Sequence, residues 1–129
     1  MAVNFVSKLK YDVSDLLEIM KILRSPEGCP WDREQTHESI KKSLIEETYE
    51  VVEAINKNDK ELMTEELGDV LLQVVFHSQI GAENGEFDFS DVCDGICKKL
   101  IERHPHVFGD ISVKDSGEVL ENWEQIKSR

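Results

Sequence analysis

Residues 44–55 read LIEETYEVVEAI and residues 61–80 read ELMTEELGDVLLQVVFHSQI, and the polar tetrapeptide NKND separates them at 56–59. In both stretches apolar residues recur at the three- and four-residue spacing of a helix. The second stretch is apolar nearly all round between Leu67 and Phe76, which indicates burial on several sides. The tetrapeptide is typical of a turn, so the pattern predicts two helices packed as an antiparallel hairpin.

Four acidic residues interrupt this apolar pattern: Glu47, Glu50, Glu66 and Asp69. The members of each pair are three residues apart, which puts both carboxylates on the apolar face of their helix. Both pairs are centred on residue 58, in the middle of the predicted turn. An antiparallel hairpin therefore sets Glu47 level with Asp69 and Glu50 level with Glu66, and the four carboxylates are predicted to converge in one partly buried patch.

Such a patch needs protons or a cation at neutral pH. Two like charges about 4 Å apart repel each other by about 4 kcal/mol at an effective dielectric near 20. Mg²⁺ or Mn²⁺ suits a shell made only of carboxylates, because both ions prefer oxygen ligands. Glu46, next to Glu47, could reach a second metal or a water at the rim. In a chain with 27 acidic residues one isolated pair is most often solvated surface, but two matched pairs on apolar faces favour a metal site.

The rest of the chain also predicts helices and no convincing strand. They are expected from Asp12 or Ser14 to about 23, from the N-cap Thr36 to about 56, over about 59–82, from the cap Ser90 to about 103, and after a capping box at 115–118. Residues 1–12 are expected to form a loose arm, and two prolines and a glycine break the pattern at 25–32. We therefore predict one all-α domain over 1–129, a four- to five-helix bundle. A homodimer or higher homo-oligomer is expected to complete it by burying the surplus apolar surface of residues 59–82.

Charge and composition narrow the possible partners. The formal net charge of −12 argues against a sequence-independent grip on a nucleic-acid polymer or an anionic membrane. The longest apolar run, around 71–76, is far too short to span a membrane. Three cysteines form no even disulfide framework, so the expected location is the cytoplasm, where thiols stay reduced.

The acidic residues also stand in a recognisable context. The segments EETYE at 46–50 and ELGD at 66–69 resemble the EExxE…ExxD motif of the MazG nucleoside triphosphate pyrophosphohydrolases. The likeness extends over about 16–126, through LLEIMKILRSPEGCPWDREQTHESI, GDVLLQVVFHSQIGAENGEFDF and KLIERHPHVFG. It implies an all-α, usually dimeric, Mg²⁺-dependent enzyme that cleaves a nucleoside triphosphate into the monophosphate and pyrophosphate. By this resemblance Glu47, Glu50, Glu66 and Asp69 carry the metal, and Glu46 helps to hold a second metal or the attacking water.

Four further residues are candidates for contact with the nucleotide. Lys99 and Arg103 are four residues apart on one predicted helix and match a MazG-like Kx₃R pattern, which favours phosphate binding over a solvated basic edge. Trp31 and Asp32 could offer a stacking surface and a polar contact to base or ribose. Trp31 could equally cover the end of the first helix. His77, on the acidic face, is interpreted as a partly buried histidine with a satisfied hydrogen bond.

A non-catalytic alternative remains open. A helical dimerisation module with a regulatory divalent-metal site would show the same acidic pairs, but it would bind metal without turning over triphosphates. A carboxylate-bridged di-iron bundle normally requires two Glu-x-x-His motifs. This sequence has one, Glu34…His37, away from the acidic pairs, so we discount that reading.

Overall fold

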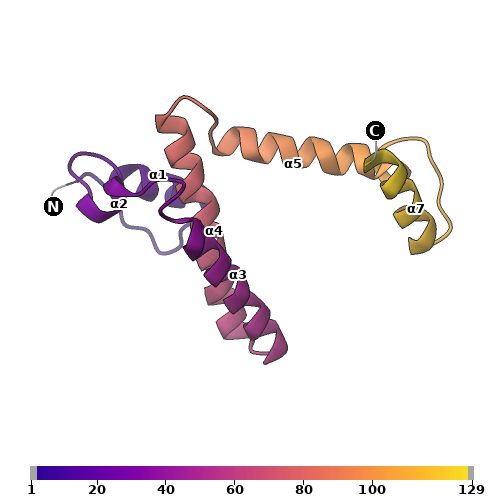
Figure 1. Ribbon diagram of the computed structural model, residues 1–129, viewed down its shortest axis with the longest axis horizontal. Coiled ribbons are helices and arrows are strands. Elements are labelled where there is room, and N and C mark those ends of the chain that lie inside the picture. The colour runs from indigo at the N-terminus through magenta and orange to yellow at the C-terminus, as the bar shows by residue number, and fades with distance from the viewer. Residues whose placement is uncertain (1–2, 128–129) are drawn as a thin grey trace. The chain divides into compact units, whose positions relative to one another are not determined.

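The computed structural model describes residues 3–127, which form seven helices and no strand (Figure 1). The predicted all-α class is confirmed. Two short helices that the sequence did not predict account for the higher helix number. The chain divides into two compact units, Met1–Phe89 and Ser90–Arg129. No helix within the described residues has both the length and the apolar character that a membrane crossing requires.

The first unit contains four helices: α1 Val13–Leu23, α2 Pro30–Glu34, α3 Lys41–Asn56 and α4 Lys60–Glu83. The long helices α3 and α4 run side by side as the predicted hairpin (Figure 1). The turn contains Asn58 with φ of 53°, a left-handed conformation that asparagine tolerates better than most residues. Asp59 then caps α4, because its carboxylate accepts the Leu62 N–H at 3.1 Å.

The start of α3 differs from the sequence prediction. The helix ends at Asn56 as expected, but it begins at Lys41, so the prediction of Thr36 as its N-cap was wrong. Thr36 and Ser39 instead bond to each other's backbone: the Ser39 N–H donates to Thr36 Oγ1 at 3.1 Å, and the Thr36 N–H donates to Ser39 Oγ at 2.8 Å. These bonds close a separate turn at 37–40.

The N-terminal segment is tied to α1. Asp12 and Asp15 form a capping box at the start of the helix. Lys8 Nζ lies 2.6 Å from Asp15 Oδ1, and Asp15 is 8% exposed. Met1 and Ala2 of the predicted arm lie outside the described residues. Residues 3–12 contain no helix or strand.

The hydrophobic core of the first unit lies where α1 and the turn before α3 meet the C-terminal half of α4. Its buried members are Met20, Ile40, Val75, Phe76 and Ile80. Fully burying a side chain of this size stabilises the fold by about 1.5–3 kcal/mol. The N-terminal half of α4, which carries Glu66 and Asp69, lies outside this cluster and faces α3.

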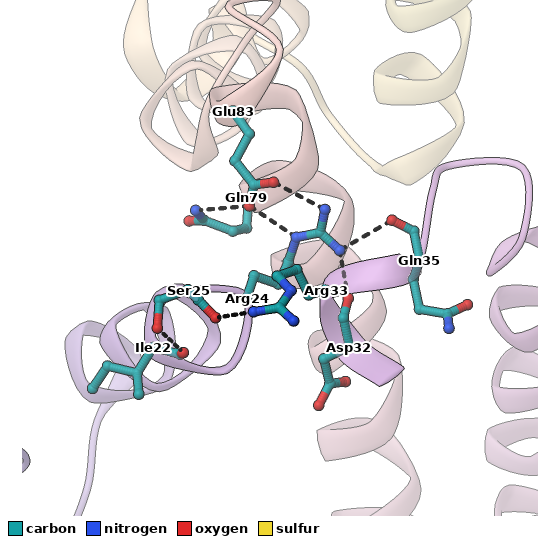
Figure 2. Close-up of polar contacts among 8 residues, drawn as sticks. All are labelled: Ile22, Arg24, Ser25, Asp32, Arg33, Gln35, Gln79 and Glu83. Atoms are coloured by element: carbon teal, nitrogen blue, oxygen red, sulfur yellow. Dashed lines mark hydrogen bonds and ion pairs between the residues drawn. The ribbon is translucent and has the colours of Figure 1, made fainter. Parts of the chain in front are cut away.

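Arg24 joins three segments beside this core (Figure 2). Its Nε and Nη2 donate to the two carboxylate oxygens of Glu83 at 2.8 and 2.9 Å, and its Nη1 donates to the carbonyls of Asp32 and Gln35 at 2.6 and 3.0 Å. The guanidinium carbon lies 5.6 Å from the centre of the Phe76 ring. The Arg24 side chain is only 7% exposed, so it holds the end of α1, the α2 segment and the end of α4 together.

The second unit contains α5 Phe89–Arg103, α6 Pro105–Phe108 and α7 Ser116–Lys127. The helix α5 begins at Phe89, so Ser90 lies within its first turn and the prediction of Ser90 as the N-cap was wrong. Half of the predicted capping box is present at the start of α7, since Asp115 Oδ1 accepts the Glu118 N–H at 3.1 Å. The Glu118 carboxylate accepts the N–H of Lys114 in place of the N–H of the cap residue.

Candidate functional site

The α3–α4 hairpin brings four acidic residues together: Glu47, Glu50, Glu66 and Asp69, hereafter the acidic cluster. One carboxylate oxygen from each lies within 4.8 Å of those of the other three. Glu47, Glu66 and Asp69 are half-buried, and Glu50 is exposed. The structure therefore shows the convergence that the matched spacing about residue 58 predicted.

The cluster is electrostatically unbalanced. A hydrogen bond with Glu50, followed by burial and the neighbouring negative charges, raises the pKa of Glu66 to about 7. Burial is the main cause of the raised pKa of Glu47, and the charge of Glu50 is the next. Within residues 3–127 none of the four acids forms an ion pair with a lysine or arginine. At neutral pH the cluster must therefore share a proton or bind a cation.

The donor set fits a divalent metal ion. Glu47 Oε2 and Glu66 Oε2 are buried without a hydrogen-bond partner among the described residues, and such orphaned oxygens are costly unless something binds them. The available ligands are all carboxylate oxygens, which hard cations such as Mg²⁺ and Mn²⁺ prefer. The cluster can hold such an ion while its more exposed side, at Glu50, stays open.

Glu46 lies beside the acidic cluster, on the outer face of α3. Together with Glu50 it lines a hollow of 370 Å³ whose other walls are Ile45, Tyr49 and Glu53. Its carboxylate is 3.7 Å from Lys42 Nζ. Ile45 and Tyr49, 68% and 65% exposed, were not among the predicted site residues. Their signal in the sequence is apolar character at a four-residue spacing alongside Glu46 and Glu50.

The four predicted nucleotide contacts lie outside the acidic cluster. Trp31 is 62% exposed on α2, and Asp32 holds Arg24 through its carbonyl. Lys99 and Arg103 lie on α5, in the other unit. The Arg103 guanidinium carbon is 5.6 Å from the centre of the Trp123 ring. A role for these four residues in binding nucleotide stays a prediction.

His77 is partly buried, as the sequence predicted, but only one of its ring nitrogens has a hydrogen-bond partner among residues 3–127. Its Nδ1 lies 2.8 Å from Nδ1 of His37, in the turn before α3. His37 was considered only as part of a discounted di-iron motif. No spacing signal links two residues that are 40 positions apart in the chain.

Comparison with known proteins identifies the sequence pattern. Residues 35–108 match the MazG nucleotide pyrophosphohydrolase domain family. The chain is 56% identical over 115 residues to the nucleoside triphosphate pyrophosphohydrolase/pyrophosphatase MazG of Thermotoga maritima. It is 54% identical over 117 residues to the nucleoside triphosphate pyrophosphohydrolase of Escherichia coli K12. These alignments cover 89% and 90% of this chain and 44% of each relative.

Two further comparisons add to this result. The protein YabN of Bacillus subtilis, which is uncharacterized, is 53% identical over 92% of this chain and 24% of its own length. The chain thus spans between about a quarter and a half of the curated relatives it matches. The crystal structure of a mazG-related protein from Thermotoga maritima superposes with a TM-score of 0.74 at 28% identity, covering 91% of this chain and 100% of that one.

Proposed function

The chain belongs to the MazG nucleotide pyrophosphohydrolase family, and from that premise we propose that it hydrolyses nucleoside triphosphates to the monophosphate and pyrophosphate with Mg²⁺, or Mn²⁺, as cofactor. The observation that carries the proposal is the acidic cluster. Four carboxylates within 4.8 Å of one another, two with buried orphaned oxygens, form a poor structural element and a good divalent-metal site. The relatives named as nucleoside triphosphate pyrophosphohydrolases support the same reaction.

In the proposed reaction a water oxygen attacks the α-phosphorus, and the bond between that phosphorus and the α–β bridging oxygen breaks. Glu47, Glu50, Glu66 and Asp69 would hold the metal, which when bound would stabilise phosphate charge as a Lewis acid and make a bound water more acidic. Glu46 and Glu47 orient the attacking water and accept its proton. Lys99 and Arg103 neutralise charge on the departing pyrophosphate, and Trp31 and Asp32 contact the base or ribose.

The decisive experiment is a panel of nucleoside triphosphates incubated with the protein and Mg²⁺, scored for pyrophosphate against orthophosphate. Monophosphate and pyrophosphate in equal amounts are expected. Orthophosphate as the first product would place the cleavage at another phosphoanhydride. Tight Mg²⁺ binding without turnover of any triphosphate would favour the non-catalytic dimerisation module with a regulatory metal site.

The roles of Lys99 and Arg103 can be separated from metal binding. Lys99→Ala and Arg103→Ala should lower kcat/KM for the triphosphate and leave Mg²⁺ binding in the absence of nucleotide nearly unchanged. Lys98→Ala is the matched control, because Lys98 lies on the same helix and is already paired with Asp94 at 2.8 Å. If kcat/KM is unaltered in both test variants, the two residues form a solvated basic edge and do not bind the triphosphate.

We also propose that the whole chain works as a single MazG-like domain in a homodimer or higher homo-oligomer. Apolar side chains on α3 that the hairpin leaves uncovered support this, among them Ile45, Tyr49 and Ile55 at 54–68% exposure. Light scattering that finds a monomer at micromolar concentration would contradict it. The net charge of −12 gives no basis for binding a nucleic-acid polymer or membrane, and free cysteines with a nucleotide substrate suit the cytoplasm.

A further inference from the structure

His37 and His77 meet edge to edge. Their Nδ1 atoms are 2.8 Å apart, the ring centroids are 5.1 Å apart, and the ring planes differ by 5°. Rings stacked face to face would have closer centroids for this nitrogen distance. The two imidazoles therefore lie nearly in one plane, with the nitrogens pointing at each other along a single hydrogen bond.

This geometry allows one proton between the two nitrogens. A neutral imidazole has one N–H donor and one acceptor nitrogen, so one ring must donate through Nδ1 and the other must accept through Nδ1. The pair can carry one positive charge and keep this bond, because the donor ring can also be protonated at Nε2. It cannot carry two charges and keep it, since both Nδ1 atoms would then bear protons.

The surroundings make the two rings unequal. The His37 side chain is 38% exposed, and its Nε2 lies 3.9 Å from Glu86 Oε1. His77 lies deeper, and burial followed by the effect of His37 lowers its pKa. Neither Nε2 has a hydrogen-bond partner among the described residues. The Phe87 ring, 6.0 Å from that of His37 and inclined by 17°, covers the pair from the segment after α4.

Two carboxylates on the elements that carry the pair already have a cationic partner. In the turn, Glu38 pairs with Lys41 at 2.6 Å. On α4, Glu83 is held by Arg24 at the end of α1. Glu86 is the carboxylate that the structure places beside His37. A second proton on the pair would therefore meet a neighbouring positive charge.

We propose that His37 and His77 form a proton-operated latch between the 37–40 turn and α4, closed while they share one Nδ1 proton and opened when both imidazoles are protonated. The turn leads directly into α3, so opening releases the start of the helix that carries Glu47 and Glu50. His77 binds protons less readily in the folded chain than in the unfolded one. Its contribution to the free energy of unfolding is thus present above the ordinary histidine range and is lost as the pH falls below it.

The latch can be tested by NMR titration of the intact chain, with ¹⁵N-labelled imidazoles. Two coupled protonation steps are expected for the His37–His77 pair, because the first proton that the pair gains opposes the second. Amide hydrogen exchange over 37–44, measured relative to the intrinsic exchange rate at each pH, should accelerate through the lower-pH step only. In His37→Asn, whose amide can still bond Nδ1 of His77 but cannot titrate, His77 should show one step. His106→Asn, in the other unit, should change neither result.

Two outcomes would overturn the proposal. One is independent single-step titration of His37 and His77 in the unsubstituted chain, which requires no variant to fold. The other is an amide exchange rate over 37–44 that, relative to the intrinsic rate at each pH, stays constant across both steps. The pair would then be an ordinary structural hydrogen bond. Both readouts are independent of nucleotide hydrolysis, so they test the latch even if the proposed enzyme activity fails.

Discussion

The two ends of α4 carry carboxylates of the same chemistry in opposite surroundings. Near its start, Glu66 faces the other three acids of the cluster, and its pKa rises to about 7. At its end, Glu83 accepts two hydrogen bonds from Arg24, and that contact is the main cause of its lowered pKa. Glu83 is therefore balanced by Arg24, whereas the acidic cluster has no lysine or arginine partner among residues 3–127 and must share a proton or bind a cation.

This difference separates a structural charge from a functional one. Arg24 donates to two carbonyls of the α2 segment and to the Glu83 carboxylate, so these groups have their partner within the chain. We expect the acidic cluster, by contrast, to lower stability when no metal is bound, because its like charges repel one another. Removing a charge should therefore have opposite effects on folding at the two ends of α4.

The largest effect is expected on catalysis when one charge is removed from the acidic cluster. Glu50→Gln or Asp69→Asn should lower kcat/KM for triphosphate hydrolysis by more than about 100-fold, because loss of a metal ligand exceeds the loss of a supporting residue. Without metal the same variants should unfold at no lower urea concentration than the unsubstituted chain, since one repelling charge is gone.

Glu65→Gln is the matched control for these variants, because Glu65 is an exposed neighbour on α4 outside the cluster. It should change neither activity nor stability. Variants of Glu50 or Asp69 that unfold easily while keeping full activity would show that the acids are structural hydrogen-bonding partners.

At the other end of α4, Arg24→Leu should lower the free energy of unfolding by about 3 kcal/mol, since it leaves Glu83 and two carbonyls without their donor. Urea denaturation measures this loss. Arg33→Leu is the control, because Arg33 is exposed and donates to loop carbonyls, with Ser25 O at 3.4 Å (Figure 2) and Pro26 O at 2.8 Å. Equal losses of unfolding free energy in the two variants would show that Arg24 stabilises the fold no more than an exposed arginine does.

Added metal should distinguish the two ends by a smaller amount. Mg²⁺ at ten times its dissociation constant should raise the free energy of unfolding by about 1.4 kcal/mol, because the metal binds only the folded arrangement. Thermal unfolding with and without Mg²⁺ measures the gain. It should vanish in Asp69→Asn and persist in Arg24→Leu. A gain that survives Asp69→Asn would place the metal elsewhere.

The smallest expected effect is a pair of opposed pH dependences. The raised pKa of Glu66 means that the metal-free folded chain binds its proton more tightly than the unfolded chain. Glu66 therefore contributes to the free energy of unfolding in full below the ordinary glutamate pKa range, and this contribution is lost as the pH rises through about 7. The lowered pKa of Glu83 has the opposite effect. Its contribution to the free energy of unfolding is present above the ordinary glutamate pKa range and is lost in acid.

Urea midpoints measured without metal from about pH 3 to about pH 8 test these signs against the ordinary glutamate pKa near 4.3. Glu66→Gln should remove the decline toward high pH, and Glu83→Gln should remove part of the decline in acid. A metal-free stability that rises steadily through neutral pH would contradict the proton held by the acidic cluster.

Local patterns in the sequence were sufficient for the hairpin and the acidic cluster. Apolar periodicity predicted α3 and α4, and the i, i+3 pairs centred on residue 58 predicted which carboxylates meet. Features that depend on contacts between distant residues were not predictable in this way. Arg24 bonds to Glu83, 59 positions away, and to two backbone carbonyls that carry no side-chain signal.

Local competition explains the remaining misses. The mutual bonds of Thr36 and Ser39 satisfy the backbone in a turn, so α3 starts later than its apolar pattern does. The segment at 25–32 reads as a break because of its prolines, yet Pro30 at the first helical position is compatible with the short helix α2.

The turn at Asn58 also determines how soon the acidic cluster can form during folding. Glu50 and Glu66 lie nearest to the turn, and Glu47 and Asp69 follow one helical turn farther out, so the cluster closes through sequence-local contacts. Such contacts form early and quickly, whereas Arg24 and Glu83 are 59 positions apart and meet only after the chain between them is arranged. The nascent hairpin thus gathers four negative charges before its core is complete. Divalent cations present during refolding should therefore act on this early step and speed folding, in addition to slowing the unfolding of the finished protein.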